Sequence, residues 1–379
     1  MMKGLLAAKK IAIVGGGPGG LTLARLLQLK GADVHVYERD LDKDVRVQGA
    51  TLDLHEESGL RALEEAGLME PFRAHYRPGA EKVRILDQHG RIFLDQHTDT
   101  TALIDRPEID RGPLRNILLA SLQPGTVIWD SRFVSLRPTG TAWELVFGNG
   151  RTALADIVIG ADGANSKIRP YVTTTGPVYS GMTVIEGSVY HAAQAAPRVY
   201  ELLKGGKLFV FGDEKSLIIS SKGDGSIAFY TGNKKAEHWN GPDLHDQAQM
   251  LAWFKQNFAG WSDIWDELFE NAVMPLVLRP QYYMPLDQHW EAQSHITLLG
   301  DAAHLMPPYA GEGVNMAMLD AVELSDCLTG NSFPDLLTAI MHYETQMRKR
   351  ASETAALTLE QTIALHSPDA IANTIAVMS

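Results

Sequence analysis

The fold is decided by residues 11–38, which read IAIVGGGPGGLTLARLLQLKGADVHVYE. An apolar run of strand length, Ile11–Val14, leads into a glycine-rich turn with the pattern G-x-G-x-x-G. Leucines at helical spacing follow as far as Gly31, and a second apolar run, Val34–Tyr37, ends at Glu38. A strand, a glycine-rich turn, a helix and a second strand that ends in an acid form the fingerprint of a dinucleotide-binding βαβ unit.

Each position in the glycine-rich turn has a physical role. Gly15 makes the tight turn, Gly17 lets a pyrophosphate approach the backbone, and Gly20 lets the helix pack closely on the strand. Pro18 lies between these glycines and is assigned to the same cofactor-binding turn. Glu38, about 20 residues further on, is expected to hold the ribose hydroxyls of an adenosine. The sequence therefore predicts an α/β domain that binds a dinucleotide.

The composition narrows the classes of protein and partner. The chain of 379 residues is 45% apolar and 21% charged, as in ordinary globular proteins, and its net charge of −12 argues against nucleic acid and anionic membranes as partners. A single cysteine, Cys327, excludes an internal disulfide and gives no metal-ligand pattern, which indicates a reducing compartment and no metal. No apolar run is long enough for a membrane helix, and Leu5–Ala8 is too short for a signal peptide. We expect a cytoplasmic monomer.

A second stretch, residues 298–320, reads LLGDAAHLMPPYAGEGVNMAMLD. Asp301 follows a short apolar run, so at a strand end it could accept hydrogen bonds from a sugar-like polyol. The segment Gly311–Asn315 precedes a helix expected from about Val314, and its free backbone N–H groups would favour an anion, such as the reduced form of a flavin. Taken alone, an ordinary helix start explains this stretch equally well.

A third motif covers residues 156–169. The apolar run Ile157–Ile159 leads into Gly-Ala-Asp-Gly, with Asp162 as its acid, and then into a short helix that contains Ser166 and Arg169. A simple strand–turn–helix unit is the alternative interpretation of this motif on its own.

The rest of the chain suggests a second lobe. Residues 83–86 and 91–94 predict a hairpin, and residues 114–122 predict a helix with Pro113 at its first position. Short alternating segments between residues 171 and 284 predict an antiparallel sheet. Residues 336–365 predict one long helix whose buried face includes Ile340, Tyr343, Met347, Ala351, Ala355, Leu359 and Ile363.

The three motifs together resemble the FAD-dependent monooxygenases of the aromatic-hydroxylase type, over nearly the whole chain. A closer resemblance is to the tetracycline-inactivating monooxygenases, and it lies in residues 36–40, 51–55, 127–130 and 300–308. The fold that this resemblance implies is a Rossmann-like FAD-binding domain, a β-sheet substrate domain and a long C-terminal bridging helix. The corresponding boundaries are 1–170 with 285–330, then 171–284, and then 331–379.

The resemblance also implies site residues. In that family the residues that match Asp53, Arg111 and Asp301 contact FAD, and the residue that matches Arg46 is implicated with NADPH. Further cofactor positions are expected at Arg39, Asp162, Pro308, Gly311, Gly313, Val314 and Asn315. The substrate is expected to contact Glu186, Lys207, Phe209 and Tyr309.

One departure concerns the substrate. Where the tetracycline enzymes hold the polar edge of the drug with Gln, Arg and His, this chain has Glu186, Lys207 and Ala228. Losing a buried hydrogen-bonding partner costs about 1–3 kcal/mol, which counts against tetracycline itself. A buried, ionised Glu186 would repel an anionic edge and favour a donor or a cation. The overall likeness still implies a tetracycline-like, polycyclic or aromatic small molecule.

The chemistry implied by the resemblance uses FAD, NADPH or NADH, and O₂. The reduced flavin activates O₂, one oxygen atom enters the substrate and the other leaves as water, so no catalytic side chain is assigned. A flavin-dependent oxidoreductase without oxygen insertion and a ligand-sequestering flavoprotein without catalysis would keep every motif. A halogenase is disfavoured because the chain has no W-x-W-x-I-P segment.

Overall fold

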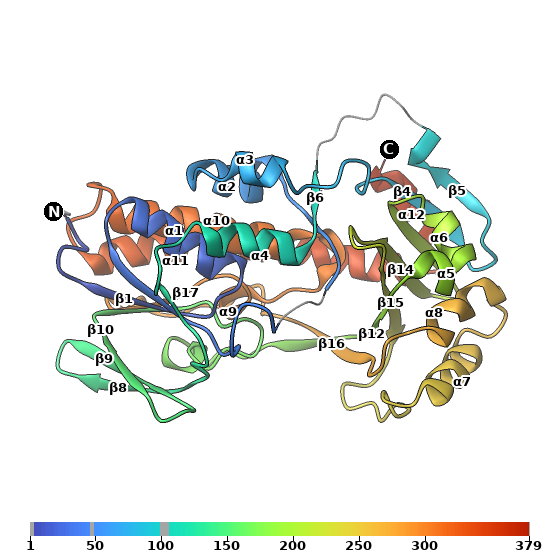
Figure 1. Cartoon of the computed structure of the whole chain (residues 1–379). Helices are drawn as coiled ribbons and strands as arrows, with labels where there is room; N and C mark the ends of the chain where they lie inside the picture. Colours follow the sequence, from blue (N-terminus) through green and yellow to red (C-terminus); the bar gives the residue numbers. More distant parts are fainter. Residues whose placement is uncertain (1–3, 46–48, 99–105, 379) are drawn as a thin grey trace.

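The computed structural model of the chain describes residues 4–45, 49–98 and 106–378. Two lobes lie side by side, each built on its own large sheet (Figure 1). No helix among the described residues is long and apolar enough to cross a membrane.

The first lobe contains a five-stranded parallel sheet in the order β17-β11-β1-β2-β7. Its strands are β1 (Lys10–Val14), β2 (Asp33–Tyr37), β7 (Val127–Ile128), β11 (Ile157–Gly160) and β17 (Ile296–Leu298). Helices α1 (Pro18–Leu29), α4 (Arg111–Ala120) and α10 (Glu312–Thr329) lie on one side of it, and a small antiparallel sheet lies on the other (Figure 1). That small sheet consists of β8 (Phe133–Thr139), β9 (Ala142–Phe147) and β10 (Thr152–Ala155).

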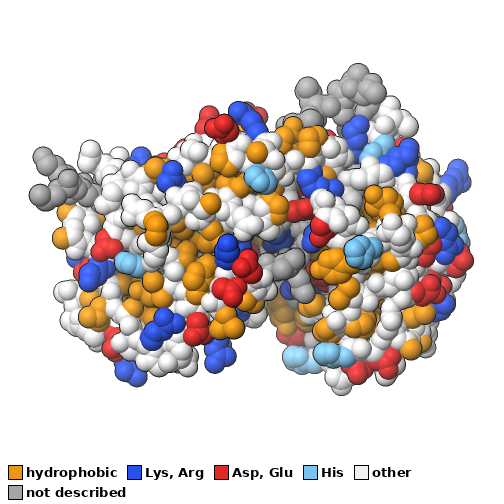
Figure 2. Space-filling view, viewed as in Figure 1, with side chains coloured by type: hydrophobic (Ala, Val, Ile, Leu, Met, Phe, Trp, Pro, Cys, Tyr) orange, Lys and Arg blue, Asp and Glu red, His pale blue; other side chains and the backbone are white. Residues whose placement is uncertain are grey.

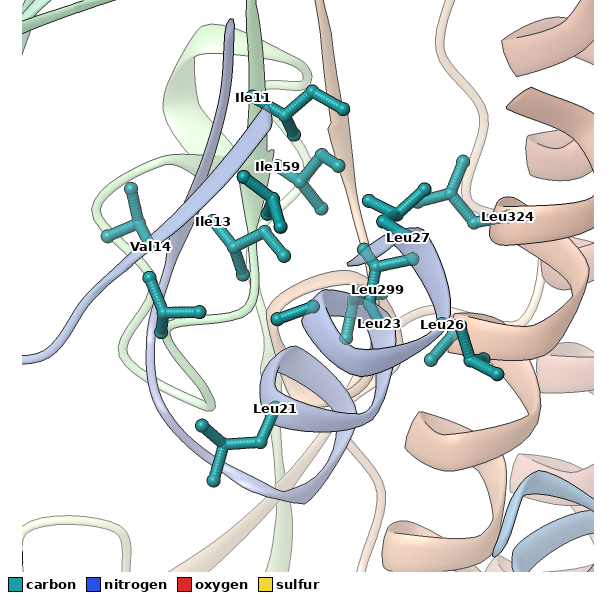
Figure 3. Close-up of a cluster of buried hydrophobic side chains, with 14 of the residues drawn as sticks. Ile11, Ile13, Val14, Leu21, Leu23, Leu26, Leu27, Ile159, Leu299 and Leu324 are labelled. Atoms are coloured by element: carbon teal, nitrogen blue, oxygen red, sulfur yellow. The ribbon is translucent and has the colours of Figure 1, made fainter. Parts of the chain in front are cut away.

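Apolar side chains from distant parts of the sequence form the core of this lobe. Leu23 and Leu27 of α1 pack with Ile11 of β1, Ile159 of β11 and Leu324 of α10 (Figure 3). Parallel strands buried on both faces need continuous apolar runs, as β1 and β11 have. The predicted βαβ unit is therefore confirmed.

The second lobe contains a seven-stranded sheet in the order β16-β12-β15-β14-β13-β4-β5. Its strands are β4 (Val83–Asp87), β5 (Ile92–Asp95), β12 (Val178–Val189), β13 (Lys207–Gly212), β14 (Lys215–Ser221), β15 (Ile227–Lys234) and β16 (Val277–Tyr283). One face is covered by α5 (Ala192–Ala195), α6 (Pro197–Leu203), α7 (Gln247–Asn257) and α8 (Asp266–Glu270). The predicted antiparallel sheet is confirmed, and the helices α5 and α6 were not predicted.

Two local predictions differ from the structure. The hairpin β4–β5 forms as predicted, but β4 pairs in parallel with β13, so these residues belong to the second sheet and not with the rest of residues 1–170. Helix α4 begins at Arg111, which places Pro113 at the third helical position. The small strands β8 and β10 were not predicted.

Helix α11 (Leu336–Leu365) contacts both lobes, and α12 (Ala370–Met378) packs on the second. Ile340, Tyr343 and Met347 of α11 lie in the core of the first lobe, whereas Leu365 packs with Val83 of the second sheet. The remaining elements are short: β3 (Leu52–Asp53), η1 (Glu56–Leu60), α2 (Arg61–Glu65), α3 (Met69–Arg73), η2 (Gln96–Thr98), β6 (Glu108–Ile109), η3 (Arg169–Tyr171), η4 (Asp263–Trp265), α9 (Asp301–His304) and η5 (Pro308–Ala310).

Candidate active site

The three sequence motifs meet at one edge of the parallel sheet. Strands β17, β11, β1 and β2 are neighbours and run in the same direction, so their carboxyl ends lie together. The glycine-rich turn follows β1, Glu38 follows β2, Asp162 follows β11 and Asp301 follows β17. Ligands of open α/β sheets bind at this edge.

The glycines of the turn do different jobs. Gly15 has φ +114°, and a Cβ there would clash with the Ala161 carbonyl. A Cβ at Gly20 would clash with the Gly15 carbonyl, whereas a Cβ at Gly17 would meet no atom within 4 Å. Gly17 is also the N-cap of α1. Open space at a helix N-terminus fits a phosphate group, so the turn has room for the cofactor.

Glu38, at the end of β2, is hydrogen-bonded to the glycine-rich turn. Its buried carboxylate accepts hydrogen bonds from the N–H of Gly16 at 2.6 Å and from the N–H of Asp40 at 3.0 Å. An ionised carboxylate has about four acceptor sites, so acceptor capacity for ribose hydroxyls is left. Arg39 beside it is exposed, and Arg46 lies outside the described residues.

Asp162 and Arg169 hold the two other strand ends in place. The Asp162 carboxylate accepts hydrogen bonds from Ser166 Oγ and from the N–H of Lys167, both at 2.6 Å. Arg169 is buried and donates from Nε to the Ala302 carbonyl at 2.6 Å and from Nη2 to the Asp301 carbonyl at 2.7 Å. Arg169 was noted in the sequence only as part of the third motif, and its link to the Asp301 turn was not foreseen.

The carboxylate of Asp301 has no hydrogen bond to another described residue. Burial raises its pKa, although the charges of His304, Arg111 and Arg169 act in the opposite direction. Asp301 is half-buried, so its carboxylate can still accept hydrogen bonds from a ligand. Hydroxyl groups of a polyol chain would supply the donors.

Helix α10 begins beside Asp301, and one detail differs from the prediction. The N–H of Gly311 donates to the Pro308 carbonyl at 3.1 Å, so it is not free. Helix geometry instead leaves the first-turn N–H groups of Glu312, Gly313 and Val314 without partners in the helix. These groups form the positive end of α10.

The Asn315 side chain is occupied by protein contacts. Its Oδ1 accepts the N–H of His55 at 3.0 Å and that of Gly59 at 3.3 Å, and its Nδ2 donates to the Asp53 carbonyl at 2.9 Å. This buried amide therefore joins α10 to the loop after β3. The structure therefore indicates that the Asn315 side chain anchors α10 to this loop, and only the backbone of Asn315 remains for the predicted contact with the cofactor.

Asp53 lies in β3, and Arg111 begins α4 just after β6, the strand that pairs with β3. Burial acts to raise the pKa of Asp53, but the hydrogen bond from His55 and the charge of Lys207 hold it below its ordinary value. Both Asp53 oxygens face Gly311, where a Cβ would come within 2.9 Å. Arg111 is exposed and donates from Nε to the Ala50 carbonyl at 3.1 Å.

The four predicted substrate contacts share one region next to this edge. Strand pairing places Phe209, Ile218, Tyr230 and Glu186 side by side across the sheet, on the face opposite the helices α5–α8. The C-terminal helices cover the β4 and β13 end of this face. Lys207 lies in the neighbouring row of the same face, with Ala228 two strands away. Tyr309, from the loop before α10, packs with Phe209 in one apolar cluster. Figure 2 shows the surface hollowed between the two lobes.

Both charged substrate candidates form ion pairs within the protein, and no pattern in the sequence predicted them. Glu186 forms an ion pair with Arg279, and Lys207 forms one with the fully buried Glu108. Tyr230, which was not predicted, accepts the N–H of Ala50 at 2.8 Å and thereby links the two lobes. The sequence indicated only that Tyr230 lies in a strand, on the same face as Ala228.

Comparison with known proteins identifies the family. Residues 8–231 and 286–356 match the family described as FAD binding domain. The chain is 32% identical over 371 residues to the monooxygenase asqM of Emericella nidulans, across 84% of this chain and 83% of the relative. The chain belongs to the family of FAD-dependent monooxygenases. The predicted family and the predicted FAD cofactor are confirmed.

Solved structures show the same fold. HpxO of Klebsiella pneumoniae, in complex with FAD and uric acid, is 22% identical, with a TM-score of 0.75 over 97% of this chain and 91% of that one. The tetracycline destructase Tet(55) is 21% identical, with a TM-score of 0.75 and the same coverage of both chains. At these identities the likeness concerns the fold and says nothing about the substrate.

Proposed function

We propose that this FAD-dependent monooxygenase hydroxylates an aromatic or polycyclic small molecule that lies between the open face of the second sheet and the start of α10. The observation that carries the proposal is the row formed by Phe209, Ile218 and Tyr230, which offers apolar surface and one phenol beside the candidate flavin edge. Since Glu186 and Lys207 are ion-paired, the face suits a molecule without a strongly charged edge. Uric acid and tetracycline, named with the two structural neighbours, are both ring compounds.

The cofactor contacts are part of the proposal. Gly17 and the N-terminus of α1 would receive the pyrophosphate, and Glu38 would hold the adenosine ribose. Asp301 would hold the ribityl chain, and the first-turn N–H groups of α10 would stabilise negative charge on the flavin ring. Gly15, Pro18 and Gly20 shape the turn. Arg39, Arg46, Asp53, Arg111, Asp162, Pro308, Gly311, Gly313, Val314 and Asn315 complete the proposed cofactor-binding set.

FAD supplies the redox chemistry and the activation of O₂, as in other flavoenzymes. The protein positions the substrate ring on Phe209 and Ile218 and orients a polar substituent with the Tyr230 hydroxyl. The ion pairs Glu186–Arg279 and Lys207–Glu108 fix the rim of this region without presenting a free charge. No side chain is assigned a proton-transfer role.

Several expectations from the sequence belong to this proposal. NADPH or NADH would supply the electrons and bind transiently, since the described residues contain one βαβ unit with the glycine fingerprint and it serves FAD. We propose the same domain division with β4 and β5 moved to the substrate domain, because β4 pairs with β13. A cytoplasmic monomer that acts on a small molecule and O₂ agrees with the single cysteine and the net charge of −12.

The test follows NADPH and O₂ consumption by the FAD-loaded enzyme with a panel of neutral aromatic and polycyclic compounds. Substrate-dependent consumption with a product heavier by one oxygen atom supports the proposal. Consumption without a heavier product identifies an oxidoreductase, and no consumption at all favours a ligand-sequestering protein. Tyr230→Phe should raise KM for the substrate, whereas Tyr200→Phe, on the exposed surface of α6, should leave it unchanged.

A further inference from the structure

A second cavity lies on the outer part of the second lobe, between the loop after β15 and helix α7. Its volume is about 450 Å³, and it shares none of its lining residues with the candidate active site. Its lining includes Lys235, Trp239, Gln249, Trp253, Gln256 and Asn257. The cavity is open to solvent on one side, so a ligand there would stay partly exposed.

Two indoles provide the aromatic part of this cavity. The rings of Trp239 and Trp253 are 5.9 Å apart. A Cβ on Gly241 would lie within 2.8 Å of the Trp239 ring, so the loop closes tightly on that indole and fixes its position. Trp253 is only 7% exposed, and its indole N–H has no hydrogen-bond partner among the described residues. Trp253 belongs to the core of the lobe, so Trp239, the less buried of the two, is the indole that a ligand can reach.

Lys235 provides a positive charge that no described carboxylate balances within ion-pair distance. Its ammonium group lies 4.9 Å from the Trp239 ring centre and donates to Asn257 Oδ1 at 3.1 Å. Burial and the nearby charge of Lys215 lower the pKa of Lys235. The adjacent Lys234 differs, because it forms an ion pair with Glu214. Lys235 is therefore free to meet an anion.

We propose that this cavity binds a planar aromatic group that carries an anionic substituent, with the ring on Trp239 and the anion on Lys235. The side-chain amides of Gln249, Gln256 and Asn257 would hydrogen-bond the edge of the ring. Adenosine phosphates and free aromatic acids share this chemistry. If the ligand is the adenosine end of NADPH, the inference also rests on the proposed function.

The cavity is connected to the candidate active site through Tyr179. The Tyr179 hydroxyl donates to the Lys235 carbonyl at 2.8 Å. The same phenol is close enough to Tyr309, in the loop before α10, to raise its pKa, although burial raises it more.

The test measures binding to the FAD-loaded enzyme by calorimetry, with adenosine 2′,5′-bisphosphate in one arm and 4-hydroxybenzoate in the other. We expect Lys235→Met to raise the Kd of whichever probe binds by at least about tenfold, the factor that corresponds to 1.4 kcal/mol. Trp239→Leu should weaken it similarly. Lys234→Met is the matched control and should leave binding unchanged, and circular dichroism verifies that each variant is folded.

The outcomes separate the two sources. Binding of the bisphosphate, with a higher KM for NADPH and an unchanged kcat in Lys235→Met, assigns the site to the dinucleotide. Binding of the aromatic acid alone, with an unchanged KM for NADPH, assigns it to a free acid. The inference is overturned if neither probe binds or if Lys235→Met behaves like Lys234→Met. It is also overturned if the bisphosphate binds but the KM for NADPH does not rise in Lys235→Met, or if only the acid binds and that KM changes. NADPH oxidation by the wild-type enzyme tests the proposed function separately.

Discussion

His304 and Asp320 form a buried pair behind the turn that carries Asp301. Nε2 of His304 lies 2.5 Å from Oδ2 of Asp320, and the same oxygen accepts the N–H of Gly300 at 2.8 Å. The other oxygen of Asp320 accepts Nη2 of Arg350, from helix α11, at 2.7 Å. The C-terminal helix therefore helps to hold the turn after β17, through one carboxylate that is fully buried.

We predict that Asp320→Asn destabilises the apoprotein by about 3–5 kcal/mol, because it leaves buried positive charge without its partner. Burial opposes protonation of His304, but the charge and the hydrogen bond of Asp320 outweigh it and raise the pKa of His304. Burial also acts to raise the pKa of Asp320, but His304 and Arg350 hold it below its ordinary value.

The sign of the pH dependence follows from these two shifts. The contribution of His304 is complete below its ordinary pKa of 6.5 and is lost as the pH rises through the raised value. The contribution of Asp320 is complete above its ordinary pKa of 3.8 and is lost as the pH falls through the lowered value. Thermal melts of wild type and Asp320→Asn should differ most at mildly acidic to neutral pH. Glu323→Gln, which removes only a half-buried partner of Arg350, is the control, and an equal loss in both variants would contradict the prediction.

A pair of glycine variants should separate cofactor binding from folding. Gly17→Ala adds a Cβ in open space, so the apoprotein should melt within about 0.5 kcal/mol of wild type, while FAD binding weakens because the methyl group occupies the place proposed for the pyrophosphate. Gly20→Ala adds a Cβ against the Gly15 carbonyl and should destabilise the apoprotein itself. Calorimetric melts and FAD titrations of both variants check this. An unaltered FAD affinity in Gly17→Ala would place the pyrophosphate elsewhere.

The sequence predicted most of the fold where local pattern and tertiary contacts agree. The buried stripe of α11 follows helical spacing from Ile340 to Ala355. Further along, Ile363 is 72% exposed, while Thr358 and Thr362 are buried. There Thr358 contacts Met306, in the turn after α9, and Leu365 at the end of the helix packs with Val83 of the second sheet, so a different face of the helix is covered. The spacing of apolar residues indicates that a helix has a buried face. The elements that pack on the helix decide which residues are buried along its length.

The site could be predicted only as far as its residues belong to motifs. The strand ends gather the glycine-rich turn, Glu38, Asp162 and Asp301 because adjacent parallel strands place their carboxyl ends together. Ion pairs between distant residues, such as Lys207 with Glu108, leave no local pattern in the sequence. A lysine expected to contact substrate therefore proved to neutralise a buried acid, and Arg169 proved to hold the Asp301 turn.

That difference leads to a prediction for Lys207. Lys207→Met should destabilise the protein by about 3–5 kcal/mol, since Glu108 is fully buried and would lose its partner. The double variant Lys207→Met/Glu108→Gln should recover much of this loss, because the uncompensated charge is gone. Denaturant unfolding of the two single variants and the double variant gives the coupling energy. A single-variant loss that the second substitution leaves unchanged would show that the pair is not the cause.

Asp301 should show opposite effects on folding and on cofactor binding. Burial raises the pKa of Asp301, so the folded apoprotein favours the protonated carboxyl. The stabilisation of the folded state by that proton is complete below the ordinary pKa of 3.8, and it is lost as the pH rises through the raised pKa. When it is ionised, the Asp301 side chain is a half-buried charge without a hydrogen-bonding partner among the described residues. Asp301→Asn removes that charge at similar size and should melt at or above the wild-type temperature, with the difference shrinking as the pH falls.

FAD binding should respond in the other direction. The proposed hydrogen bonds from the ribityl hydroxyls to an ionised Asp301 are charge-assisted, and each is worth about 1.5–3 kcal/mol. Asp301→Ala should therefore weaken FAD binding by about 10- to 150-fold, and Asp301→Asn by less, because the amide oxygen still accepts. Melting temperatures of the apoproteins across pH, together with FAD titrations of the three proteins, test both statements. Loss of apoprotein stability in Asp301→Asn with unchanged FAD affinity would make Asp301 a structural residue and remove it from the cofactor site.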